Sequence, residues 1–185
     1  MDTRRDFQQT LADARAGEGI ALGELFRDLY PRVVRYLGAF EPDEADDLGS
    51  DTWIDVVSAL DRFEGDERAL RALAFTIARR RLIDLQRRRS RRPVEPIEPE
   101  RLERVGEVGD VEQEALAELA TREALERIAE LPQDQAEVVL LRVVGGLSAD
   151  DVARIMGKRP GTVRVIQHRA LLRLAEQVRQ GDVTR

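Results

Sequence analysis

The chain of 185 residues contains no cysteine, one histidine and few aromatic residues. Without cysteine there is no disulfide framework and no thiolate metal site, and a single histidine cannot build a histidine-rich metal centre. No apolar run approaches the ~20 residues of a membrane-spanning helix, and the N-terminus lacks the apolar segment of a signal peptide. We therefore expect a cytoplasmic protein without a membrane span, metal or cofactor, and with a core of Leu, Val, Ile and Ala.

Motifs of common enzymes are also missing. Gly157-Lys158 is followed by Arg159 rather than by Ser or Thr, so this stretch does not match a phosphate-binding loop. No serine lies in a nucleophile elbow, and the carboxylate nearest in sequence to His168 on its C-terminal side is Glu176. We identify no catalytic residue and predict that the chain is not an enzyme, although a small helical enzyme remains the third alternative.

The most informative segment runs from Leu147 to Arg164. Ser148 and Asp151 have the spacing of a capping box, Gly157 suits the left-handed position after a helix end, and Pro160 fits the first turn of a second helix. This pattern predicts a helix-turn-helix whose second helix enters the DNA major groove, although an ordinary helical hairpin in a bundle would also fit. The polar side of the second helix carries Arg164, His168, Arg169 and Arg173.

Charge is arranged in blocks, although the net charge of −6 gives no hint of this. Between Glu41 and Glu67 every charged side chain except Arg62 is acidic, whereas Arg68 to Arg92 holds ten arginines against the single acid Asp84. Blocks of opposite sign suggest two different partners, one of them polyanionic. We interpret the arginine block as a site of phosphate contact; a solvated helix face is the alternative.

Apolar residues recur at helical spacing over residues 20–40, 45–60 and 69–89, then again from Val111 to the C-terminal region. Pro31 predicts a kink or a helix start, and an acidic stretch with three prolines between Pro93 and Asp110 predicts a linker. Because no segment alternates with a strand period, we expect an all-α fold. It has two small helical domains, residues 1–92 and 111–185, joined by an extended linker over residues 93–110 that could span about 60 Å.

Three aromatic residues lie among the charged blocks. Trp53 sits among carboxylates, which favours a protein-binding surface, although a solvated face is possible; a metal site is disfavoured because the EF-hand glycine and final glutamate are missing. Phe63 and Phe75 accompany the arginines and could stack on unpaired bases, the alternative for Phe75 being a place in the core.

Several motifs in order resemble bacterial RNA polymerase sigma factors of the extracytoplasmic-function group. Residues 47–54 (DLGSDTWI) are similar to a family stretch that docks on the polymerase clamp, and residues 71–84 to the basic promoter-melting helix. Residues 131–148 are similar to the lead-in to the −35-reading domain, and residues 161–170 to its recognition helix. The resemblance covers Leu25 to about Leu174.

The resemblance implies a sigma factor that binds core RNA polymerase, recognises the −10 and −35 promoter elements and melts DNA. The partners would be the clamp of the β′ subunit, the flap of the β subunit, promoter DNA and an anti-sigma factor. A stand-alone DNA-binding regulator is the alternative. The residues expected to bind core polymerase are Asp47, Leu48, Asp51, Thr52, Trp53, Asp55 and Val56.

Two further sets are expected to touch DNA. The loop from Phe63 to Arg68 would hold a flipped base, and the arginines after it would contact phosphates. On the basis of the resemblance, the set for the −10 element is Phe63, Glu64, Asp66, Arg68, Arg71, Arg79, Arg80, Arg87 and Arg88. The set for the −35 element is Arg159, Thr162, Arg164, Val165, His168, Arg169 and Arg173.

Overall fold

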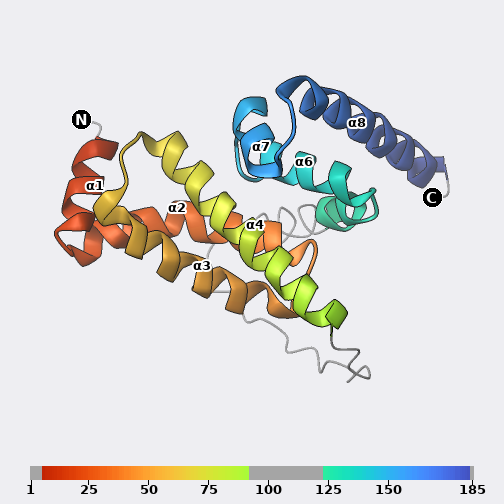
Figure 1. Ribbon diagram of the computed structural model, residues 1–185. Coiled ribbons are helices and arrows are strands. Elements are labelled where there is room, and N and C mark those ends of the chain that lie inside the picture. Colours follow the sequence, from red (N-terminus) through yellow and green to blue (C-terminus); the bar gives the residue numbers. More distant parts are fainter. Residues whose placement is uncertain (1–5, 92–122, 184–185) are drawn as a thin grey trace.

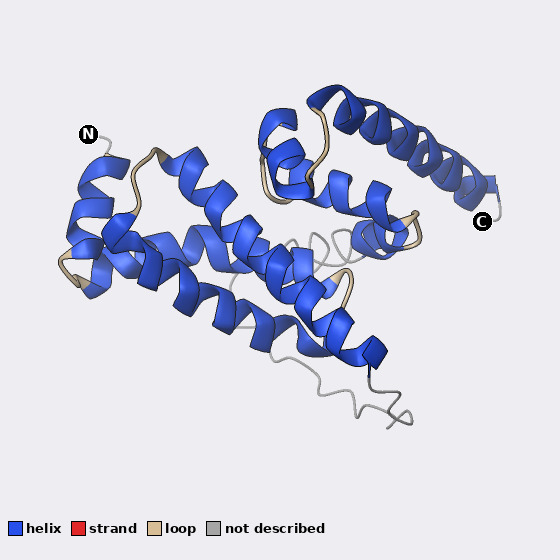
Figure 2. Ribbon diagram, in the orientation of Figure 1, coloured by secondary structure: helices blue, strands red, loops and turns tan. Residues whose placement is uncertain are grey.

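The computed structural model describes residues 6–91 and 123–183, and every extended regular element in those ranges is a helix (Figures 1 and 2). The expected all-α fold is therefore confirmed. The linker over residues 93–110 and the start of the helix expected from Val111 lie outside the described residues. The helices of the first domain are α1 (Phe7–Arg15), α2 (Gly19–Gly38), α3 (Ala45–Ala59) and α4 (Glu67–Arg91), with short 3₁₀ turns η1 (Pro42–Glu44) and η2 (Leu60–Arg62).

The first domain is a bundle in which α2, α3 and α4 pack on one another and α1 covers the start of α2 (Figure 1). The three predicted helices are confirmed to within two residues at each end. Pro31 lies inside α2 and does not start a helix. The chain continues as one helix on either side of Pro31, whose side chain is exposed.

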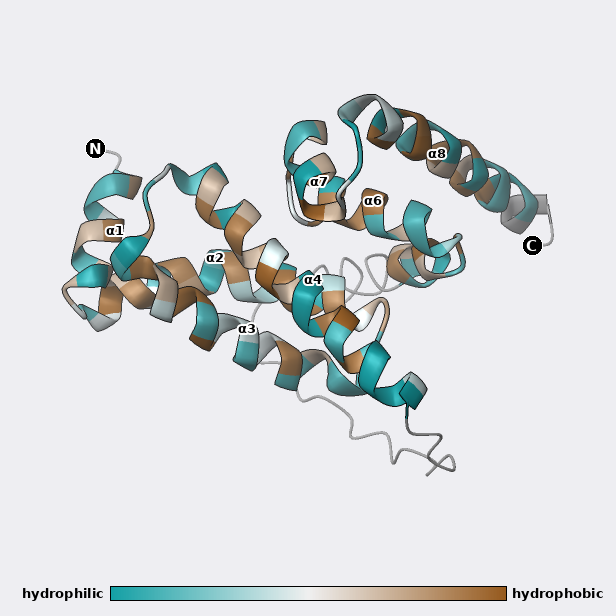
Figure 3. Cartoon of the chain, in the orientation of Figure 1, coloured by the Kyte–Doolittle hydropathy of each residue, from teal (hydrophilic) through white to brown (hydrophobic). Residues whose placement is uncertain are grey.

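Two expectations about this domain were wrong or incomplete. Ile54, one of the apolar residues in the helical spacing of residues 45–60, is 61 % exposed, because α3 turns Leu48, Thr52 and Val56 inward instead. The helix α1 was not expected at all, since nine residues with a modest apolar face give a weak signal. Apolar residues otherwise line the inward faces of the helices (Figure 3).

The second domain begins in the described chain with a helical stretch over residues 123–129. It continues with α6 (Gln133–Val143), α7 (Ala149–Met156) and α8 (Pro160–Val183). The helix α6 begins directly after Pro132, which serves as its N-cap. The long α8 packs on both α6 and α7.

The two domains lie against each other. The helix α4 packs on α7 of the second domain (Figure 1), and α2 also reaches the second domain, through Arg32 and Tyr36. Phe75 of α4 is fully buried, with Tyr36 at a ring-centroid distance of 5.6 Å and Gly145 of the second domain beside it. The buried apolar residues of both domains belong to one core cluster. Within the described ranges, no helix is both long and apolar enough to cross a membrane.

Candidate nucleic-acid interface

The helix-turn-helix is built as its sequence predicts. The Ser148 hydroxyl accepts the backbone N–H of Asp151 at 3.2 Å, and the Asp151 carboxylate accepts the N–H of Ser148 at 3.0 Å, which completes the capping box. Gly157 adopts φ 64°, a left-handed conformation that strains other residues, and Pro160 is the first residue of α8. The turn therefore fixes the direction in which α8 leaves α7.

The outer face of α8 carries the side chains that we expect at the −35 element. Val163 and Ala170 point into the domain and are fully buried. The seven expected residues are all exposed, and Arg173 also donates a hydrogen bond to Gln135 at 3.2 Å. They are Arg159, Thr162, Arg164, Val165, His168, Arg169 and Arg173. All seven residues are therefore accessible to solvent, and four of them are arginines.

The residues expected at the −10 element differ in their exposure to solvent and in their partners. Glu64, Arg80, Arg87 and Arg88 are exposed, and Phe63 is half-buried. Asp66 is exposed but its carboxylate accepts the backbone N–H of Ala69 at 2.8 Å, so it acts as the N-cap of α4. Sequence reasoning missed this capping role, although an Asp directly before a helix is its ordinary signal.

Besides Arg80, which lies 3.5 Å from Asp55, and Arg87, which lies 3.9 Å from Asp84, three arginines of the same set are paired within the protein. Arg79 donates to Glu137 at 2.6 Å and Arg68 to Asp151 at 2.8 Å, and both acceptors belong to the second domain. Arg71 pairs with Glu67 and lies 3.5 Å from Asp28. Phe75, one of the two possible base-stacking residues, is in the core. In this arrangement Phe75 is buried and Arg71 and Arg79 are half-buried, whereas Arg68 stays exposed although its guanidinium is paired.

The acidic face of α3 is tied to the basic helix. The Arg81 guanidinium contacts Asp51 at 2.7 Å and Asp55 at 2.8 Å, and Arg80 lies 3.5 Å from Asp55. Asp47 is exposed and free of these pairs. Sequence reasoning missed the role of Arg81 in these ion pairs. The pairs join residues about thirty positions apart, so they form only when α3 and α4 pack.

Not every residue expected to bind polymerase reaches the surface. Leu48, Thr52 and Val56 are buried in the first domain, and the Thr52 hydroxyl donates to the Leu48 carbonyl at 2.7 Å. The expected direct contact does not fit their positions, because their side chains form the packing beneath the surface of α3. That surface is left to Asp47, Asp51, Trp53 and Asp55.

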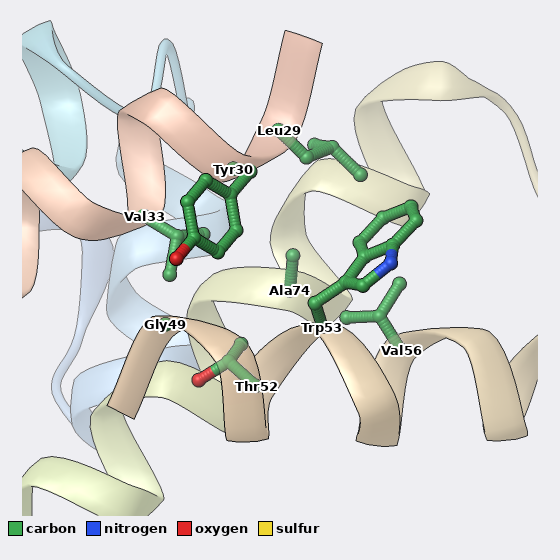
Figure 4. Close-up of a pocket in the computed structure, with 8 residues that line it drawn as sticks. All are labelled: Leu29, Tyr30, Val33, Gly49, Thr52, Trp53, Val56 and Ala74. Atoms are coloured by element: carbon green, nitrogen blue, oxygen red, sulfur yellow. The ribbon is translucent and has the colours of Figure 1, made fainter. Parts of the chain in front are cut away.

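Trp53 stands in an aromatic cluster with α2. Its ring lies edge-on to Phe26 at 5.2 Å, and Phe26 stacks on Tyr30 at 4.4 Å. Figure 4 shows the indole projecting from α3 toward Leu29 of α2, beside a small gap between the helices. Trp53 is only half-buried. A rigidly held, partly exposed indole beside carboxylates is suited to anchor a protein partner.

The buried Glu137 is a residue that sequence reasoning missed. It accepts a hydrogen bond from the Tyr36 hydroxyl at 3.0 Å besides the one from Arg79. Burial, together with the Glu137 carboxylate beside it, raises the pKa of Tyr36 well above its ordinary value. The one signal in the sequence is a carboxylate amid the apolar run from Ala136 to Leu141.

Comparison with known proteins agrees with this architecture. Residues 25–92 match the family described as Sigma-70 region 2, and residues 121–174 match Sigma-70, region 4. The chain is 34 % identical to the ECF RNA polymerase sigma factor ShbA of Streptomyces griseus, over 92 % of this chain and 96 % of that protein. It is 35 % identical to SigD of Mycobacterium tuberculosis, another ECF RNA polymerase sigma factor, over 91 % and 82 %.

A solved structure shares the fold. The structure of CnrH in complex with the cytosolic domain of CnrY superposes with a TM-score of 0.61, at 23 % identity, over 94 % of this chain and 97 % of that one. Together, the two matched regions and the full-length relatives define the family. The chain belongs to the extracytoplasmic-function sigma factors of the sigma-70 family, which are initiation factors rather than enzymes and direct promoter-specific transcription by RNA polymerase.

Proposed function

We propose that three surfaces of this sigma factor bind different partners. They are the exposed arginines of α4, the exposed face of α8 and the surface around Trp53 on α3. The first domain (residues 1–92) binds core polymerase and the −10 element, the second (residues 111–185) binds the −35 element, and residues 93–110 link them. The observation that supports this proposal is that the half-buried indole of Trp53 is presented by α3, whereas the exposed Arg87 and Arg88 are presented by α4 and the exposed Arg164 and Arg169 by α8.

At the −10 element, the exposed arginines Arg80, Arg87 and Arg88 contact backbone phosphates. The loop from Phe63 to Arg68 accepts an unpaired base, and Phe63 is the aromatic residue placed to stack on it. Phosphate contacts offset the few kcal/mol that unstacking a base costs.

At the −35 element, α8 lies in the major groove. Arg164, His168 and Arg169 are assigned to base edges, and Arg159, Thr162 and Arg173 to phosphates. The exposed Val165 is suited to contact a thymine methyl group.

Core polymerase is bound mainly by the surface around Trp53, which meets the clamp of the β′ subunit, while the second domain meets the flap of the β subunit. The test is a fluorescence anisotropy titration with purified bacterial core polymerase. Trp53→Ala should weaken binding about thirtyfold or more, as loss of an aromatic hot spot does, and Trp53→Phe should recover part of it. Wild-type affinity in a folded Trp53→Ala variant, or no binding by the wild type, would refute the assignment.

Base recognition by α8 is tested with holoenzyme on promoter variants selected from a randomised −35 element. Arg164→Ala should cost about 1–3 kcal/mol of binding and relax the preference at one base pair. Arg179→Ala is the matched control, because Arg179 is an exposed arginine on the same helix outside the recognition set. If both variants behave alike, Arg164 does not contact a base.

We further propose an anti-sigma protein as a regulatory partner in the cytoplasm. A cleft of about 420 Å³ lies between the domains, lined by residues that include Ala72 and Leu73 of α4 and Ile155 of α7, with Arg68 and Arg154 also lining it. Its apolar side chains suit the apolar face of an amphipathic helix, and its two arginines and two carboxylates, Asp66 and Asp151, suit polar residues of either charge beside that face. With the purified regulator in hand, Leu73→Glu should weaken the complex while sparing binding to core polymerase.

A further inference from the structure

The loop from Phe63 to Arg68 is held by a helix that lies outside the matched family regions. This helix, α1, precedes residue 25, where the match to Sigma-70 region 2 begins. It packs on α2 and on η2, at the end of the first domain where α3 passes into α4 (Figure 1). Leu11 and Ala14 are buried and fix α1 to the bundle. The polar side chains of α1 therefore extend from an anchored backbone.

Arg15, in the last turn of α1, binds the backbone at the end of η2. Its Nε donates to the Leu60 carbonyl at 2.8 Å, and its Nη2 donates to the Phe63 carbonyl. Carbonyls at the end of a helical segment carry a partial negative charge that favours a cation. A guanidinium can bridge two of them, because its donors form a rigid fork that an ammonium lacks. Arg15 therefore fixes the backbone on the first side of the loop.

Gln8, two turns earlier on α1, holds the middle of the loop. Its side-chain amide donates to the Gly65 carbonyl at 3.1 Å. A Cβ on Gly65 would lie 2.7 Å from the Ala69 side chain and 3.0 Å from the Phe63 ring, so the ring packs directly against this glycine. Holding the Gly65 carbonyl therefore also holds the surface on which the Phe63 ring rests.

Asp66 fixes the far side of the loop, because its carboxylate accepts the Ala69 N–H at 2.8 Å and caps α4. Between the fixed points, Phe63 is half-buried and Glu64 is exposed, so both side chains remain accessible to a ligand. A loop whose backbone is held in this way loses less conformational freedom when it binds. The contacts from α1 should therefore influence both the affinity and the selectivity of the loop.

We propose that α1 is a positioning element for base recognition at the −10 element, with Arg15 and Gln8 as its positioning residues. Neither side chain needs to touch the base. They hold the backbone at Phe63 and Gly65, so that the Phe63 ring is presented in one position. This inference rests on the proposed assignment of the loop to an unpaired base, and one of its tests therefore involves no DNA.

The DNA-free test is the mobility of the loop in the full chain, measured from a nitroxide attached through Glu64→Cys. Glu64 is exposed and the chain has no native cysteine. Arg15→Gln removes two hydrogen bonds from a charged donor, and each is worth about tenfold in the ratio of held to released loop. The fast component of the spectrum should therefore rise about tenfold or more relative to the slow one. Gln8→Ala should act in the same direction to a smaller extent, although alanine is the better helix former.

Two other exposed side chains serve as matched controls, because each bonds within its own helix. Gln9 donates to Asp13 of α1 at 2.7 Å, and Arg27 donates to a carbonyl of α2 at 2.9 Å. Gln9→Ala and Arg27→Gln should leave the nitroxide spectrum unchanged. Wild-type mobility in both Arg15→Gln and Gln8→Ala, or an equal gain in the controls, would overturn the positioning role.

The second test is base preference, measured with holoenzyme on promoters selected from a pool randomised at the −10 element. In Arg15→Gln, affinity for the preferred base should fall about tenfold, because affinity scales with the fraction of loops that are competent to bind. Promoters with other bases, held through phosphate contacts, should lose less, so the preference relaxes. Arg15→Lys should recover part of it, since it restores the charge but not the fork. A merely structural role would lower the stability of the fold without changing the preference of folded holoenzyme.

Phe63→Ala separates this inference from the proposed function. If Phe63→Ala relaxes the preference and Arg15→Gln does not, the positioning role is wrong and the assignment of the loop stands. If neither variant changes the preference although the nitroxide reports a released loop, the assignment of the loop to a base fails and the positioning role fails with it. Circular dichroism shows whether each variant is folded, and Gln8→Ala keeps the test decisive if Arg15→Gln is not.

Discussion

Asp151 offers the most precise test of how the second domain is held together. Its carboxylate accepts the Ser148 N–H at 3.0 Å, the Ser148 hydroxyl at 2.6 Å and Arg68 Nε at 2.8 Å. In Asp151→Ala, the part-buried Ser148 N–H loses its acceptor, which costs about 1–3 kcal/mol. The Ser148 hydroxyl also loses the bond that orients it, and so part of a cap worth about 1 kcal/mol. We expect a total loss of about 2–3 kcal/mol.

Urea unfolding followed by far-UV circular dichroism measures this loss, and fluorescence of the single tryptophan, Trp53, reports whether the first domain stays folded. Asp150→Ala is the control, since Asp150 is exposed in the same first turn of α7. It should cost only the charge–dipole interaction, about 0.3–1 kcal/mol. Equal losses in the two variants would refute the reasoning.

The same carboxyl predicts an acid dependence. Burial alone would raise the pKa of Asp151, but the hydrogen bonds from Ser148 and Arg68 outweigh it and lower that pKa below its ordinary value. The carboxylate therefore stabilises the fold above its unfolded pKa of about 4, and this contribution disappears as pH falls through the lower folded pKa. Asp151→Asn should show a flatter acid limb than the wild type, whereas parallel curves would contradict the assignment.

Three further predictions concern other positions. Phe75→Ala should cost about 3–5 kcal/mol in chemical denaturation, because the ring is fully buried between the domains; a loss below about 1 kcal/mol would mean that the ring is not packed there. Gly157→Ala should cost about 1–2 kcal/mol in thermal unfolding, because its φ of 64° strains a side chain, and an unchanged melting temperature would argue against this turn. The pKa of Tyr36 is raised in the folded protein. The neutral Tyr36 hydroxyl therefore stabilises the fold fully below about pH 10, the pKa of an unfolded tyrosine, and this contribution is lost as the pH rises through the pKa of the folded state. Tyr36→Phe should remove that alkaline loss, and melting temperatures that fall equally in both proteins would contradict it.

Local rules explain most of what the sequence predicts correctly. The capping box at Ser148, the left-handed Gly157 and the start of α8 at Pro160 each depend on a few neighbouring residues, and all three are confirmed. The helices α2, α3 and α4 of the first domain follow from apolar periodicity, whereas α1 does not. The resemblance to the family rests on the order in which these motifs follow one another along the chain.

What could not be predicted depends on tertiary packing. Periodicity does not distinguish Ile54, which is exposed, from Leu48 and Val56, which are buried, because the choice depends on where α2 and α4 lie. The pairing of Arg79 with Glu137 joins residues 58 positions apart, so a helix rich in arginine looks uniformly available from sequence. Only the fold shows that part of it faces the other domain.

The continuous core has a consequence for how the chain tolerates being cut. Buried residues of both domains form one cluster, so the covalent connection is not the main force that keeps the halves together. A single cleavage between the described ranges should leave two fragments that still migrate as one particle. Expressed alone, the first fragment would expose the apolar face around Phe75, and the second would expose the apolar face that packs on it. Co-expression should bring the two fragments together again. The continuous core therefore predicts that the two domains stay associated when the connection between them is cut.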